Sequence, residues 1–151
     1  MWPDVPTDPV LDLSGELVVQ AARLVRAVRR RTGDVLPAGV RVLSLLDQYG
    51  PLGIGRLADL DRCSQPTMTG AVKSLAERGW VARESDPADA RATVVTLTAE
   101  GVTALTDVRR RNAEVVASRF AGQTTHSPED LATAVSVLRA VLETPTEKGL
   151  L

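Results

Sequence analysis

A short stretch near the middle of the chain carries side chains suited to polar recognition. The run Ser64-Gln65-Pro66-Thr67-Met68-Thr69-Gly70 supplies hydroxyl and amide groups, and Lys73 follows with an ammonium group. Such groups form the hydrogen bonds that contacts to base edges and phosphates require. The chain has no Gly-rich phosphate loop, nucleophile elbow or cluster of metal ligands. We therefore expect a binding protein, not an enzyme, with no cofactor and no metal.

The element that must present these side chains is a helix beginning after Ser64. The Ser64 hydroxyl can accept from an amide of the first turn, and Pro66 lies where a helix can spare an N–H group. Gly79 is a suitable residue after the helix end. One face is apolar, formed by Met68, Val72, Leu75 and Ala76. The polar side chains fall mainly outside that face.

A hairpin follows this helix. Residues 80–83 and 92–97 have the composition of paired strands, and residues 86–91 form a turn that ends in the cation Arg91. A polar-faced helix followed by a hairpin with a basic tip is the outline of a winged helix. Such a unit places the helix in the major groove of DNA and the wing in the neighbouring minor groove.

Apolar periodicity predicts helices on both sides of this unit. We expect them at residues 11–31, from Pro37 to Tyr49, from Gly53 to Leu60, from Thr98 to Phe120 and from Ser127 to Leu142. The first and the last two are too apolar to stand alone, and such helices commonly pair with a second copy. The predicted fold class is mainly α: a winged helix-turn-helix with terminal dimerisation helices and a wing sheet of two or three strands.

The same pattern predicts the organisation of the chain. We expect a flexible arm at residues 1–10, dimerisation helices at 11–36 and 99–151, and a winged helix-turn-helix at 37–98, all in one intertwined domain. The long helix from Thr98 should bury Val102, Leu105, Val108, Ala113, Val116 and Phe120.

Composition excludes several classes of protein. Among 151 residues, 44% are hydrophobic, which is ample for a core, yet no apolar run approaches the length of a membrane span. One cysteine and no signal-peptide pattern favour a cytoplasmic protein without structural disulfides. Aromatic residues make up 3%, too few for the stacking platforms that bind single strands.

The charge balance leaves an alternative open. Residues 51–91 contain six cations (Arg56, Arg62, Lys73, Arg78, Arg83, Arg91) and six anions (Asp59, Asp61, Glu77, Glu84, Asp86, Asp89). DNA affinity must then come from the placement of the cations. A winged helix that binds a protein partner is the competing interpretation.

Other reactive side chains support weaker hypotheses. Cys63 precedes the Ser64 helix and could act as a redox switch, although a small apolar core residue is the favoured interpretation. His126 is the single histidine and has no ligand cluster near it in sequence. Asp59 and Asp61 are interpreted as solvent or cap residues, and Trp80 as packing the wing onto the helices.

An ordered set of motifs resembles the MarR family of bacterial transcription regulators. It comprises Leu57-Ala58, the Ser64–Thr69 run, Leu75-Ala76-Glu77-Arg78-Gly79-Trp80-Val81, Asp86-Pro87-Ala88-Asp89-Ala90-Arg91-Ala92 and Val95-Thr96-Leu97-Thr98-Ala99-Glu100-Gly101. The resemblance implies a homodimeric repressor that binds a palindromic double-stranded DNA operator. It also implies release by a small aromatic or phenolic effector in a crevice between the dimerisation helices and the reading head.

The resemblance also assigns DNA-binding residues. They are Ser64, Gln65, Pro66, Thr67, Thr69, Gly70, Lys73, Asp89 and Arg91. Arg91 matches the wing arginine that enters the minor groove, and Asp89 matches the carboxylate that orients it. Gly70 and Ala90 stand where the family often has arginine, so two potential contacts to DNA are missing.

Overall fold

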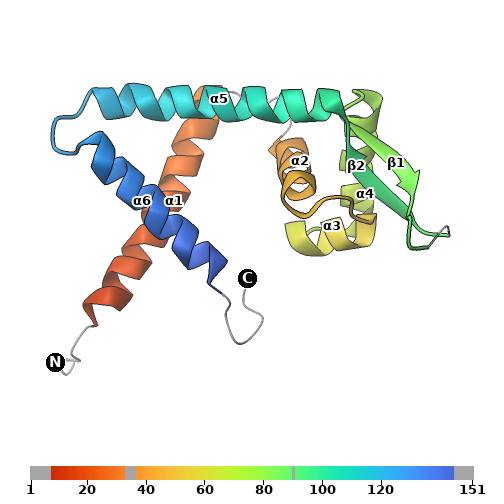
Figure 1. Ribbon diagram of the computed structural model, residues 1–151, viewed down its shortest axis with the longest axis horizontal. Coiled ribbons are helices and arrows are strands. Elements are labelled where there is room, and N and C mark those ends of the chain that lie inside the picture. Colours follow the sequence, from red (N-terminus) through yellow and green to blue (C-terminus); the bar gives the residue numbers. More distant parts are fainter. Residues whose placement is uncertain (1–7, 33–36, 90, 145–151) are drawn as a thin grey trace. The chain divides into compact units, whose positions relative to one another are not determined.

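The structure is a computed structural model that describes residues 8–32, 37–89 and 91–144 (Figure 1). Its elements are α1 (Pro9–Thr32), α2 (Pro37–Tyr49), α3 (Ile54–Asp61), α4 (Gln65–Glu77), β1 (Val81–Ser85), β2 (Thr93–Leu97), α5 (Ala99–Ala121) and α6 (Pro128–Glu143). The predicted class, mainly α with a winged helix-turn-helix, is confirmed. Over the described ranges, no helix combines the length and apolar character needed to cross a bilayer.

The helix ends follow the capping residues of the sequence. The Ser64 side chain accepts a hydrogen bond from the Thr67 backbone N–H at the start of α4, and Thr98 Oγ1 accepts from the Gly101 N–H at the start of α5. At the start of α6, Ser127 and Asp130 form a reciprocal capping box. These three helices therefore begin where a side chain can satisfy an orphan amide, whereas α3 begins after Gly53 without a side-chain cap.

The wing is a two-stranded antiparallel hairpin in which Val81 pairs with Leu97 and Ser85 with Thr93. A single bridge adds Leu52, whose backbone exchanges hydrogen bonds of 3.1 and 2.8 Å with Val95. The prediction of two or three strands is thus confirmed. β1 begins one residue later than predicted because the Trp80 N–H bonds to the Leu75 carbonyl at the end of α4.

The core lies among α2, α3, α4, the hairpin and the first half of α5. Its fully buried side chains are Val42, Leu43, Leu57, Met68, Val72, Leu75 and Val95. In α5, Leu105 is buried as predicted, but Val102 and Ala113 are exposed. Gly101 faces inward instead, because the helix start packs directly against the backbone of Trp80. A pattern that counts apolar side chains cannot detect a contact made by a glycine.

The chain divides into two compact units, Met1–Val115 and Val116–Leu151. The division falls inside α5. Pro9 and Val10 belong to α1, so the expectation of a flexible arm at residues 1–10 is wrong for these two positions. Residues 1–7, the predicted break at 33–36 and the predicted frayed end at 146–151 lie outside the described residues.

Candidate nucleic-acid interface

The two faces of α4 separate apolar from polar side chains. Met68, Val72 and Leu75 are buried in the core. The opposite side exposes every α4 residue that the sequence assigned to DNA, together with the N-cap: Ser64, Gln65, Pro66, Thr67, Thr69, Gly70 and Lys73. The buried apolar side of α4 therefore anchors the helix in the core and leaves its polar side facing outward.

The first turn of α4 is held in place by its own side chains. Ser64 Oγ lies 3.2 Å from the Thr67 backbone nitrogen and 2.7 Å from Thr67 Oγ1. Loss of such an N-cap costs about 1 kcal/mol. Gln65 points toward α3, since a Cβ on Gly55 would lie 3.3 Å from Gln65 Nε2. Ordering of these groups before binding reduces the entropy that a ligand must overcome.

Lys73 lies one turn further along the same face. Its Nζ is 3.9 Å from Glu77 Oε1, and the two side chains are 74% and 65% exposed. An exposed pair at this distance contributes little to stability. The ammonium group of Lys73 is therefore accessible to another anion.

The tip of the wing is built by two aspartates. Asp86 Oδ1 accepts from the Ala88 N–H at 2.8 Å, and Asp89 Oδ1 accepts from the Arg91 N–H at 3.0 Å. These are Asx turns, in which the carboxylate fixes the backbone locally. Arg91 is exposed, and its guanidinium forms no ion pair with any carboxylate of the described residues.

This geometry modifies the predicted role of Asp89. The resemblance implied that Asp89 orients the Arg91 side chain. In the structure, the Asp89 carboxylate instead accepts a hydrogen bond from the Arg91 backbone N–H. Asp89 thus shapes the turn from which Arg91 projects. Ala90, the other notable wing position, lies outside the described residues.

Asp61 has a structural role that the sequence analysis did not identify. Its carboxylate receives hydrogen bonds of 2.7 and 3.1 Å from Nε and Nη2 of Arg41, and its side chain is 8% exposed. The hydrogen bond from Arg41 is also the main reason why the pKa of Arg41 is raised. The interpretation of Asp61 as a solvent or cap residue is wrong, because the pair joins α2 to α3 across twenty positions of sequence.

Cys63 lies in the turn between α3 and α4, and His126 lies just before α6. Cys63 is a free, half-buried thiol at the edge of the core, and its N–H bonds to the Ala58 carbonyl. His126 Nδ1 lies 3.7 Å from Asp130 Oδ2, beside the cap of α6. Within the part of the chain that the structure describes, no group of three potential metal ligands exists.

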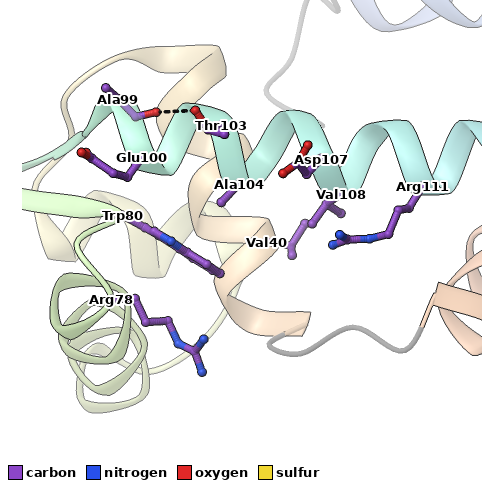
Figure 2. A pocket seen from close by; sticks show the side chains of 10 residues that line it. All are labelled: Val40, Arg78, Trp80, Ala99, Glu100, Thr103, Ala104, Asp107, Val108 and Arg111. Carbon is purple, nitrogen blue, oxygen red and sulfur yellow. Dashed lines mark hydrogen bonds between the residues drawn. The ribbon is translucent and has the colours of Figure 1, made fainter.

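A cavity of about 580 Å³ lies beside α5 (Figure 2). Its lining combines Val40, Ala99, Ala104 and Val108 with Arg78, Trp80, Glu100, Thr103, Asp107 and Arg111. The Arg78 guanidinium lies 5.3 Å from the centroid of the Trp80 ring, within the range of a cation–π contact. This volume is in the usual range for small-molecule sites.

The resemblance implied a crevice between the dimerisation helices and the reading head, but no sequence pattern named the residues that line this cavity. Its walls come from α2, the end of α4, Trp80 just before β1, and α5. In Figure 2, Trp80 and Arg111 extend from different parts of the chain toward Val40. Trp80 does pack between the wing and the helices, as the sequence predicted, and it also forms part of this wall. The preceding Gly79, with φ of 73°, turns the chain so that Trp80 can do so.

Comparison with known proteins identifies the same architecture. Residues 37–93 match the MarR family. An uncharacterized HTH-type transcriptional regulator of Mycobacterium leprae is 31% identical over 110 residues, covering 72% of this chain and 77% of that protein. An HTH-type transcriptional regulator of Mycobacterium tuberculosis is 29% identical over 133 residues, covering 87% of this chain and 93% of that protein.

A solved structure shows that the similarity extends along most of the fold. The transcriptional regulator Tm0710 of Thermotoga maritima superposes with a TM-score of 0.66 at 26% identity, covering 91% of this chain and 96% of that one. The residues that match the family, 37–93, run from α2 into β2 and form the winged helix-turn-helix, here called the reading unit. The chain therefore belongs to the MarR family of transcriptional regulators.

Proposed function

We propose that the chain acts as a homodimeric repressor whose two copies of α4 read a palindromic double-stranded DNA operator. The observation that carries this proposal is the sorting of side chains on α4: Met68, Val72 and Leu75 are buried, whereas the polar side from Ser64 to Lys73 is exposed. The exposed guanidinium of Arg91 at the wing tip supplies a second contact, suited to the minor groove.

The terminal helices support the dimer. α6 has no buried residue, and α1 has Val28 as its one buried residue. Large apolar side chains on both are exposed in the single chain, including Leu13 at 66%, Val18 at 70%, Leu138 at 38% and Leu142 at 71%. Apolar surface of this extent is typical of a face that a partner covers. A second copy presents α4 twice, which suits a palindrome.

The cavity beside α5 suits a small aromatic or phenolic effector. The Trp80 ring offers a stacking surface, and the guanidinium groups of Arg78 and Arg111 can pair with a carboxylate or phenolate. Arg78 is also the C-cap residue of α4. A ligand that moves Arg78 or Trp80 would therefore act on the end of the recognition helix, so that binding of effector and DNA would be coupled.

Selection of bound duplexes from random DNA tests this function directly. We expect a palindromic consensus, with affinity that falls steeply as salt rises. Arg91→Ala should reduce the steepness of the plot of log affinity against log salt concentration (the salt slope) by about one unit. The melting temperature should not change, since Arg91 is exposed. Small aromatic acids added to the preformed complex should release the DNA.

The alternative, a winged helix that binds a protein, is favoured by the equal numbers of cations and anions in residues 51–91. It predicts no enrichment of any duplex in the selection. It also predicts association with a DNA-free partner that is insensitive to salt. The dependence of affinity on salt concentration therefore distinguishes DNA binding from protein binding.

A further inference from the structure

A shallow hollow lies between the exposed side of α4 and the base of the wing. Thr69, Lys73, Ala76 and Glu77 line it from α4, and Arg83 lines it from β1. Arg83 is exposed and forms no ion pair with a carboxylate of the described residues. The hollow thus brings two cations and a hydroxyl group to one place, beside the surface proposed to read DNA.

The position of this hollow follows from the shape of the duplex. A major groove and its neighbouring minor groove are separated by one sugar–phosphate backbone. If α4 occupies the first groove and Arg91 the second, this backbone must cross the wing between them. Arg83 lies on β1, between the helix and the tip of the hairpin.

From this arrangement we propose that Lys73 and Arg83 together hold one phosphate of the operator, and that Glu77 weakens this contact. The inference rests on the proposed function and adds Arg83 and Glu77 to its binding surface. Arg83 supplies a cation on a face where Gly70 supplies none. Glu77 pairs loosely with Lys73 at 3.9 Å, so its carboxylate both competes for the ammonium group and repels the phosphate.

Binding of the selected duplex by single variants tests the assignment. Arg83→Ala should lower the salt slope by about one unit, which amounts to about a fourfold smaller loss of affinity between about 50 and 200 mM salt. Arg83→Lys should retain most of the slope because it keeps the charge. Glu77→Gln should bind more tightly than the wild type, a gain that partial unfolding cannot produce.

The matched control is Arg110→Ala, which removes an exposed arginine from α5, outside the winged helix. We expect it to bind as the wild type does. The double variant Lys73→Ala/Arg83→Ala should lose less affinity than the product of the two single losses, because both side chains hold the same phosphate.

Three results would overturn the proposal. If Arg83→Ala binds as Arg110→Ala does while Arg91→Ala weakens binding, the hollow alone is misassigned. Independent, multiplicative losses from Lys73→Ala and Arg83→Ala would place the two cations on separate phosphates. A wild-type chain that enriches no duplex would refute both this inference and the proposed function.

Discussion

Gly70 occupies the exposed side of α4, and nothing lies within 4 Å of the position where its Cβ would stand. An arginine there would meet open space, and it would restore a cation that the family often has on this face. We predict that Gly70→Arg strengthens binding to the selected duplex and raises the salt slope by about one unit.

The measurement is fluorescence anisotropy over a range of salt, with Gly70→Ala as the control for helix propensity. Replacing a mid-helix glycine by alanine should stabilise the protein by about 0.5–1 kcal/mol without adding a charge. If Gly70→Arg gained no more affinity than Gly70→Ala, this position would not face the phosphates.

At the scale of elements, the start of α5 packs against the backbone of Gly79 and Trp80. A Cβ on Gly101 would lie 1.9 Å from the Trp80 carbonyl oxygen, while Thr98 Oγ1 donates to the Gly79 carbonyl at 2.6 Å. We predict that Gly101→Ala lowers the free energy of unfolding by about 1–3 kcal/mol, because the helix must shift away from the Trp80 backbone. Urea denaturation measures the loss. Stability equal to that of the wild type would show that the contact is easily relieved.

The capping box of α6 gives this element a dependence on pH. The Ser127 N–H donates to the Asp130 carboxylate at 2.8 Å, which holds the pKa of Asp130 below its ordinary value of 3.8. Because the pKa of Asp130 is lower in the folded chain than in the unfolded chain, its charged form stabilises the fold at pH values above the unfolded-state pKa. This stabilisation is lost as the pH falls through the folded-state pKa. We predict that acid reduces helicity less in Asp130→Asn than in the wild type.

Circular dichroism measured between about pH 5 and pH 2 tests this prediction. The variant should be less stable at pH 5 and should approach the wild type at pH 2. Parallel titrations of the two proteins would show that the capping carboxylate contributes nothing to the acid response.

The elements themselves were largely predictable, because their signals are local. The bounds of α2 follow from Pro37 and Gly50, and α4 and α6 follow from the hydroxyl caps Ser64 and Ser127. What the sequence did not reveal depends on residues that are distant along the chain. The Arg41–Asp61 pair and the 2.8 Å contact between Arg109 of α5 and Asp47 of α2 have no local pattern. For the same reason, no sequence pattern named the residues that line the cavity or the Arg83 hollow.

For the whole molecule, the proposed function requires two symmetry-related copies of the winged helix. In the proposed dimer, the exposed apolar sides of α1 and of α6 would each face the second copy, and α4 with Arg91 would face DNA. In such a dimer each copy binds one half-site of the operator. The affinity and the two-fold symmetry of binding therefore both require two copies.

Hydroxyl-radical footprinting of the selected operator tests this claim most directly. We predict two equivalent protected half-sites whose centres lie about 10–10.5 bp apart, or a multiple of that spacing, with the wing contact at each half-site lost in Arg91→Ala. A single asymmetric protected patch, or protection that Arg91→Ala leaves unchanged, would contradict the account.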